Sequence, residues 1–170
     1  DMMTRLLTSL ALLLALSANA VAADTPAGKP GATATAIFAG GCFWCTESDF
    51  EKLNGVIGAE SGYTAGKKAD PTYEQVSAGS TGHTEAVRVT YDPSRVSYVQ
   101  LVDYFWRTID PTVKDKQFCD SGTQYRSGIY WQNEAERTVA ENSRNALVSS
   151  GKFKEIHTES AAATVIYSAE

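Results

Sequence analysis

Residues 34–47 read Ala-Thr-Ala-Ile-Phe-Ala-Gly-Gly-Cys-Phe-Trp-Cys-Thr-Glu, and the short β-prone run at 34–39 passes through two glycines into a different pattern. From Trp44 onward the apolar positions Phe50 and Leu53 lie among acidic residues, which predicts a helix that ends at Asn54-Gly55. The two glycines allow other groups to approach the backbone closely. The segment therefore predicts a strand, a tight turn and a helix, with Cys42 at the start of the helix.

The rest of the chain alternates between strand and helix patterns. Strands are predicted at 56–63, 85–91, 127–131 and 163–167, and helices at 72–78, 98–109 and 134–150, with a long loop at 111–126. The clearest signals are the alternation in 85–91 and the capping box formed by Ser97 and Gln100. We expect one α/β domain of the α+β kind, a two-layer sandwich with a mixed central sheet, flanking helices and a ferredoxin-like core.

The N-terminal part has the build of a secretory signal. Arg5 precedes an apolar run at 6–16, and small residues with A-x-A spacing follow to Ala23. The alternative is a membrane anchor, but the run is shorter than the roughly 20 apolar residues that span a bilayer. We expect residues 1–23 to be a signal peptide, 24–35 a flexible leader and 36–170 a single catalytic domain. The protein would then be exported, and in a Gram-negative cell it would be periplasmic.

Composition narrows the class of partner. The net charge is −5, which argues against nucleic acid because phosphate binding requires a basic surface. We also expect no membrane attachment after the signal is removed, and a monomer. The chain has three cysteines, so they cannot all pair internally, and at least one is free or cycles between oxidation states.

Cys42 is the first candidate for chemistry. A helix N-terminus presents unsatisfied N–H groups and the positive end of the helix dipole, which favour a thiolate. The alternative is that Cys42 is simply a small, buried hydrophobic residue. Phe43 and Trp44 are adjacent, so both cannot easily enter one core, and we expect one or both to line a pocket sized for a methyl group. Cys45 completes a C-x-x-C motif, which is typical of thiol–disulfide exchange. The motif could instead supply two ligands of a zinc site that Cys119 and His83 complete.

Two further clusters contain reactive groups. Glu85 opens a strand, and partial burial would raise its pKa and let it act as an acid; the alternative is a solvated strand end. His83, two residues earlier, is expected to be a hydrogen-bonded loop residue rather than a ligand. The loop at 117–127 carries Cys119, Asp120, Tyr125 and Arg126, and long polar loops of this kind are often functional.

Taken in order, these clusters resemble the A-type peptide methionine sulfoxide reductases. The matching stretches are Gly-Gly-Cys-Phe-Trp-Cys-Thr-Glu (40–47), Pro-Thr-Tyr-Glu-Gln-Val (71–76), Gly-Ser-Thr-Gly-His-Thr-Glu-Ala-Val (79–87), Tyr-Asp-Pro (91–93) and Asp-Ser-Gly-Thr-Gln-Tyr-Arg-Ser (120–127). The resemblance runs from about Ala36 to the end of the chain. It implies reduction of methionine S-sulfoxide, free or within proteins, and so the repair of oxidised proteins.

The resemblance also implies a role for each matching residue. Cys42 corresponds to the nucleophile, and Phe43 and Trp44 to the pocket for the methyl group. Glu85 corresponds to the acid, Tyr73 and Tyr125 to donors that hold the sulfoxide oxygen, and Asp120 to a carboxylate that orders the site, while His83 has at most a supporting role in substrate binding. No bound cofactor or metal is implied, only an external dithiol reductant, thioredoxin or a thioredoxin-like protein.

The sequence departs from the family pattern in two places. Many family members carry a resolving cysteine near the C-terminus, but here no cysteine follows Cys119, so the candidates are Cys119 and Cys45, and the loop position favours Cys119. Family members also continue past the position of Glu170, with a Tyr-His-Gln motif, which implies a fragment or a natural truncation. The competing interpretations are a thioredoxin-like dithiol oxidoreductase that uses Cys42 and Cys45, and a structural zinc or binding module.

Overall fold

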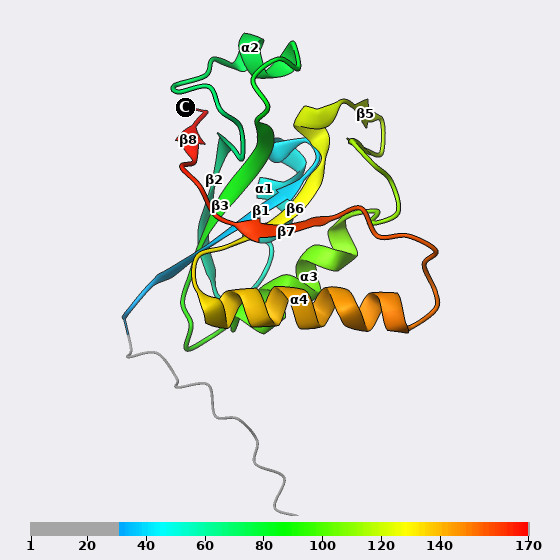
Figure 1. Cartoon of the computed structure of the whole chain (residues 1–170). Coiled ribbons are helices and arrows are strands. Elements are labelled where there is room, and N and C mark those ends of the chain that lie inside the picture. The colour runs from blue at the N-terminus through cyan, green and yellow to red at the C-terminus, as the bar shows by residue number, and fades with distance from the viewer. Residues whose placement is uncertain (1–30, 170) are drawn as a thin grey trace, which may run out of the picture.

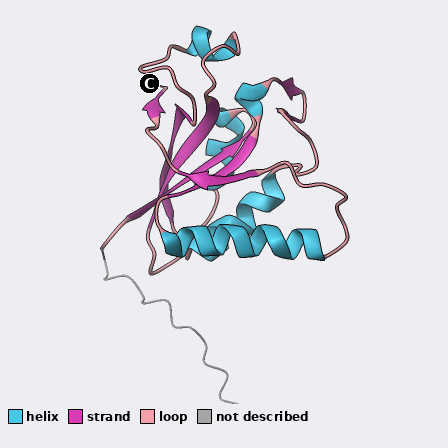
Figure 2. Ribbon diagram, viewed as in Figure 1, coloured by secondary structure: helices cyan, strands magenta, loops and turns pink. Residues whose placement is uncertain are grey.

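The computed structural model describes residues 31–169, in which helices cover a central sheet (Figures 1 and 2). The strands are β1 (Ala34–Gly40), β2 (Val56–Thr64), β3 (Thr84–Tyr91), β4 (Lys116–Gln117), β5 (Asp120–Ser121), β6 (Ser127–Trp131), β7 (Glu159–Ala162) and β8 (Tyr167–Ser168). The helices are α1 (Phe43–Glu51), α2 (Tyr73–Ser77), α3 (Tyr98–Thr108), α4 (Glu134–Ser149) and the 3₁₀ helix η1 (Thr123–Tyr125).

The six-stranded sheet has the order β7-β6-β1-β3-β2-β8. All of its pairings are antiparallel except β6 with β7, which is parallel and is connected through α4. Within it, β1-α1-β2-β3-α3-β6 forms a β-α-β-β-α-β unit whose strands lie in the order β6-β1-β3-β2, the ferredoxin-like arrangement. The expected mixed sheet, two-layer packing and ferredoxin-like core are therefore confirmed.

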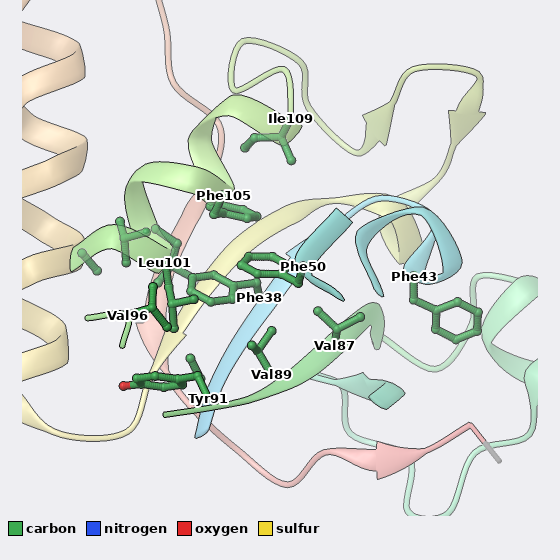
Figure 3. Close-up of a cluster of buried hydrophobic side chains, with 14 of the residues drawn as sticks. Phe38, Phe43, Phe50, Val87, Val89, Tyr91, Val96, Leu101, Phe105 and Ile109 are labelled. Carbon is green, nitrogen blue, oxygen red and sulfur yellow. The ribbon is translucent and has the colours of Figure 1, made fainter. Parts of the chain in front are cut away.

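The main core lies between the helices and one face of the sheet. Phe38 from β1 is completely buried and stacks on Phe50 of α1 at 4.9 Å and on Phe105 of α3 at 5.1 Å between ring centroids. Figure 3 shows this stack, with Phe43 at the far edge of the cluster from Tyr91. The same apolar contacts that hold α1 on the sheet therefore fix the helix end next to Cys42.

The opposite face of the sheet is covered by the C-terminal segment. Ile37, Ala39, Ala86 and Tyr130 form a second buried cluster, against which Ala161, Ala163 and Ile166 pack. The strand predicted at 163–167 is wrong, because the chain there crosses the sheet between two short strands, β7 and β8. Both owe their pairing to distant partners, β6 and β2, which the local sequence pattern does not reveal.

The predicted loop at 111–126 contains more structure than expected. The strands β4 and β5 form a hairpin with a two-residue loop, Phe118-Cys119, and η1 follows. Gln117 anchors the hairpin, since its buried side chain accepts a hydrogen bond from the Asp110 N–H (2.8 Å) and donates one to the Asp110 carbonyl (2.7 Å). The pairs are too short to produce an alternating pattern, so the sequence did not predict them.

The first strand begins where the β-prone run at 34–39 predicts, and only the end of the leader expected at 24–35 overlaps it. The first strand begins at Ala34, so Ala34 and Thr35 belong to the sheet rather than to the leader. The segment expected to be a signal peptide, 1–23, lies outside the described residues. Within 31–169, no helix is both long enough and apolar enough to cross a bilayer.

Replacement of Phe38 should test the central stack. We expect Phe38→Ala to lower the free energy of unfolding by about 3–5 kcal/mol, because it removes a fully buried ring and leaves a cavity between three elements. The measurement is urea denaturation followed by circular dichroism. Val148→Ala is the control, since Val148 is half exposed on α4 and should change stability by less than about 0.5 kcal/mol. Equal effects of the two substitutions would contradict the assignment of the core.

Candidate active site

Cys42 is the N-cap residue of α1. Its carbonyl accepts hydrogen bonds from the N–H groups of Cys45 (3.1 Å) and Thr46 (3.2 Å), so the helix begins directly after it. Gly41 turns the chain out of β1 with a φ of +91°, and a Cβ at this position would lie 2.6 Å from the Gln117 Cβ. Glycine is thus required both by the turn and by the contact with the β4–β5 hairpin, and the turn presents the sulfur at a helix start as predicted.

Glu85 lies beside the start of the same helix. Its side chain, in β3, is 2% exposed, and its Oε2 accepts a hydrogen bond of 2.9 Å from the Phe43 N–H. Burial raises the pKa of Glu85 above its ordinary value; the Phe43 N–H opposes this, and the nearby charge of Asp120 adds to it. The burial expected from the sequence is confirmed, and the result is a carboxyl group disposed to keep its proton.

Four aromatic rings line a pocket next to these groups. Phe43 is 2% exposed while Trp44 is 66% exposed, so the two neighbours do point to different environments. The Phe43 ring lies 5.7 Å from that of Tyr63, and the Trp44 ring is nearly parallel to that of Tyr73 at 6.5 Å. The pocket has a volume of about 290 Å³, and its other lining residues are Glu47, Ser61 and Ala169.

The two tyrosines and Asp120 lie in short elements between the long strands and helices: Tyr73 in α2, Asp120 in β5 and Tyr125 in η1. Tyr73 opens α2, where Thr72 and Gln75 form a capping box. Tyr125 lies in η1, and the backbone on both sides of it accepts hydrogen bonds from the buried Thr84 hydroxyl. Burial raises the pKa of Tyr125, and the charges of Glu85 and Asp120, with Tyr73 and Cys42, raise it further. These electrostatic contacts indicate that the predicted residues converge.

His83 is a hydrogen-bonded loop residue, as expected. Its ring is buried, its Nδ1 accepts a hydrogen bond from the Gly66 N–H (3.0 Å), and its Nε2 lies 2.6 Å from the Lys68 carbonyl. Both ring nitrogens are used to hold the 66–68 loop, so a direct role in substrate binding is not supported. The zinc interpretation loses its histidine for the same reason, and no group of three or more potential ligands could hold a metal ion among residues 31–169.

The other two cysteines differ in their relation to Cys42. Cys45 is one helical turn away, and the pKa of its thiol is raised by burial, then by the charge of Cys42 and a hydrogen bond to it. Cys119 is exposed at the tip of the β4–β5 hairpin. All three thiols are free. The charge of Cys42 therefore acts on Cys45, while the choice of Cys119 or Cys45 as resolving residue stays a prediction.

Sequence reasoning missed four residues of the pocket: Glu47, Ser61, Tyr63 and Ala169. Tyr63 lies directly opposite Glu85 in the β2–β3 register, and burial, together with Glu85, raises its pKa to about 12, so it stays a neutral donor. The Ser61 hydroxyl donates a hydrogen bond to Glu47 Oε2. The alternation of β2 could have placed Ser61 and Tyr63 on one face, but only the strand register pairs Tyr63 with Glu85.

Larger pockets lie elsewhere. One of about 630 Å³ between α3 and α4 is lined by mainly apolar residues, among them Val102, Trp106 and Val139. It contains none of the groups described above. Chemistry rather than volume therefore identifies the site at Cys42.

The buried Glu85 should make the fold less stable as pH rises. Its folded-state pKa lies above its unfolded value, so its contribution to stability is complete below the unfolded pKa and is lost as pH rises through the folded one. We expect Glu85→Gln to be more stable than the wild type at neutral pH, with a smaller difference at pH 4. Urea titrations across this range would measure it, with Glu51→Gln, an exposed acid of α1, as control. A pH-independent difference would contradict the raised pKa.

Comparison with known proteins agrees with the geometry. A sequence model of the peptide methionine sulfoxide reductase family matches residues 34–170. Curated relatives named peptide methionine sulfoxide reductase MsrA include one from Limosilactobacillus reuteri, 52% identical over 70% of this chain and 68% of the relative, and one from Ligilactobacillus salivarius, 50% identical over 80% of each.

Solved structures of the same kind are also similar. Methionine sulfoxide reductase A of Corynebacterium diphtheriae has a TM-score of 0.68 and 35% identity over 81% of this chain and 68% of its own. Reduced Mxr1 from Saccharomyces cerevisiae has a TM-score of 0.74 and 30% identity over 84% of this chain and 82% of its own. The thioredoxin-like oxidoreductase interpretation is not favoured, and the chain, a thiol-dependent methionine sulfoxide reductase, belongs to the peptide methionine sulfoxide reductase family.

Proposed function

We propose that the enzyme reduces methionine S-sulfoxide, free or within proteins, with Cys42 as nucleophile and Glu85 as acid. The observation that carries this proposal is the 2.9 Å hydrogen bond from the Phe43 N–H to Glu85 Oε2, because it ties a buried carboxyl to the residue that follows the thiol. Phe43 and Trp44 take the methyl group, and Tyr73 and Tyr125 donate to the sulfoxide oxygen. Asp120 contributes a charge that favours the protonated form of Glu85.

The proposed reaction begins at the sulfoxide oxygen. Glu85 transfers its proton to this oxygen, which makes the sulfur electrophilic, and the Cys42 thiolate attacks the sulfur. The sulfur–oxygen bond breaks and releases the oxygen as water. A water molecule then attacks the Cys42 sulfur and loses a proton, the new sulfur–sulfur bond breaks, methionine leaves with that electron pair, and Cys42 becomes a sulfenic acid. The two electrons that reduce the substrate come from the Cys42 sulfur.

A second thiol then condenses with the sulfenic acid, which releases water and forms a disulfide. We assign this step first to Cys45, since it follows Cys42 by one helical turn and the charge of Cys42 raises the pKa of its thiol. Residues three apart on a helix have Cβ atoms about 5–6 Å apart. A disulfide needs Cβ atoms about 3.5–4.5 Å apart, so the two residues must move closer by about 1–2 Å as the bond forms. Cys119, favoured by its loop position, is the alternative resolving residue.

An external dithiol completes the cycle by reducing the disulfide. Mxr1, whose reduced form is 30% identical to this chain, has also been solved in complex with Trx2, and this supports thioredoxin or a thioredoxin-like protein as the reductant here. The exposed position of Cys45 and Cys119 suits contact with such a partner. We propose that the enzyme needs no bound cofactor or metal.

The place of action follows from the N-terminal sequence. The basic, apolar and small-residue regions of 1–23 support export, which in a Gram-negative cell leads to the periplasm. The mature protein would then begin in the 24–35 leader and act as a monomeric catalytic domain.

Epimer-resolved turnover tests the reaction and its nucleophile. N-acetyl methionine sulfoxide should be reduced in its S form, and the R form should remain, with dithiothreitol as reductant and chiral chromatography as the measurement. Cys42→Ser should lower turnover by at least about 10³-fold, because the nucleophile is removed while the pocket and Glu85 remain. Reduction of both epimers, or full activity of folded Cys42→Ser, would refute the assignment.

A single turnover distinguishes the two resolving cysteines. With one equivalent of substrate and no reductant, we expect a Cys42–Cys45 disulfide in peptide mass spectrometry, and one methionine released per chain. Cys119→Ser should give the same product, whereas Cys45→Ser should leave a sulfenic acid that dimedone traps. A Cys42–Cys119 disulfide in the wild type would assign resolution to the hairpin instead.

A further inference from the structure

The pocket beside Cys42 contains a charge that the proposed reaction does not use. Glu47 lines it together with four aromatic rings, those of Phe43, Trp44, Tyr63 and Tyr73. Phe43 and Glu47 are four residues apart on α1, and Trp44 and Glu47 are three apart, so the carboxylate lies on the same side of the helix as these rings. An apolar pocket for a neutral methyl group does not require this carboxylate.

Glu47 is held in place on one side only. The buried Ser61 hydroxyl donates a hydrogen bond to the Oε2 of Glu47. The other carboxylate oxygen, Oε1, takes no part in this bond. Among the ion pairs formed within residues 31–169, none involves Glu47, so no lysine or arginine neutralises it there. The face of an aromatic ring has a negative potential that attracts a cation within about 6 Å of the centroid, and four rings line this pocket.

This arrangement is typical of a site for an organic cation. Aromatic faces around a carboxylate recognise quaternary ammonium groups in proteins, because such cations carry no N–H donors and are weakly hydrated. A dialkyl sulfonium has the same character. The chemistry at the neighbouring sulfur produces such a group, since a sulfoxide protonated on oxygen is a hydroxysulfonium cation whose methyl group shares the positive charge.

We propose that the pocket is a sulfonium site: Glu47 and the four rings bind positively charged methylsulfonium groups and so favour the protonated sulfoxide over the neutral one. The inference rests on the proposed function for its catalytic meaning, but the binding of a stable sulfonium can be tested apart from turnover. Ser61 acts as a positioning residue, because it touches the carboxylate rather than the ligand.

The test compares a cation with a neutral molecule of the same shape. N-acetyl-S-methylmethionine amide carries a dimethylsulfonium group, and N-acetyl-5-methylnorleucine amide replaces it with an isopropyl group. Isothermal titration calorimetry would be done on Cys42→Ser in the full chain, since removal of the thiol prevents methyl transfer from the sulfonium. We expect the sulfonium to bind about five- to tenfold more tightly than the isostere, although a purely apolar pocket prefers the neutral molecule.

A matched pair of variants assigns the preference to Glu47. In the same background, Glu47→Gln should abolish the preference for the sulfonium, and Glu51→Gln, the same charge change one turn further along α1, should retain it. If Glu47→Gln does not fold, as judged by circular dichroism, Glu47→Asp keeps the charge on a shorter arm and should retain part of the preference. Loss of the preference in folded Glu47→Asp would then overturn the proposal.

The outcomes separate this inference from the reductase activity. Equal binding of the two probes to the Cys42→Ser protein, or an unchanged preference in Glu47→Gln, overturns the sulfonium site whatever the turnover assay shows. Conversely, a preference that depends on Glu47 in a protein without S-epimer reduction would leave the site standing and refute only its catalytic use.

Discussion

The hydrogen bond from the Phe43 N–H to the Glu85 carboxylate joins the two halves of the site. A helix start leaves N–H groups without partners, and here one of them is satisfied by a side chain from another strand. The contact places the buried Glu85 at the start of α1, and burial raises its pKa above the ordinary value. One contact between α1 and β3 therefore holds Glu85 beside the residue that follows Cys42, while burial, opposed by this hydrogen bond, raises the pKa of Glu85.

The ferredoxin-like sheet makes that contact possible. The Phe38 stack holds α1 against β1 and β3, and the pairing of β1 with β3 brings the start of the helix to the strand that carries Glu85. The less regular parts supply the remaining groups, Tyr73 from α2 and Tyr125 from η1. Rigid elements thus place the thiol and the acid, while loops supply the donors, a division that is common in enzymes because loops can vary without loss of the core.

In the proposed mechanism and the proposed sulfonium site, the two sides of the site have opposite electrostatic tasks. On the oxygen side, a neutral carboxyl and phenols can donate hydrogen bonds to an accumulating negative charge. On the methyl side, aromatic faces and the Glu47 carboxylate favour a positive charge. A protonated sulfoxide needs both at once, because its oxygen accepts the proton while its sulfur and methyl group take up the charge. In the proposed mechanism the separation of these environments is what activates the substrate.

Much of this was predictable from local sequence. The strand–glycine–helix pattern placed Cys42 at a helix start, the alternation of 85–91 gave β3, and the Ser97 capping box gave α3, because hydrogen bonding and periodicity within a few residues determine such features. Other features required the folded chain. The short strands β4, β5, β7 and β8 exist through pairing, His83 is engaged by the backbone of another loop, and Tyr63 faces Glu85 only through the β2–β3 register. The sequence alone determined which chemical groups are available and where helices and strands begin. Tertiary structure decided which of those groups meet, since burial, pKa and charge balance depend on neighbours that are distant along the chain.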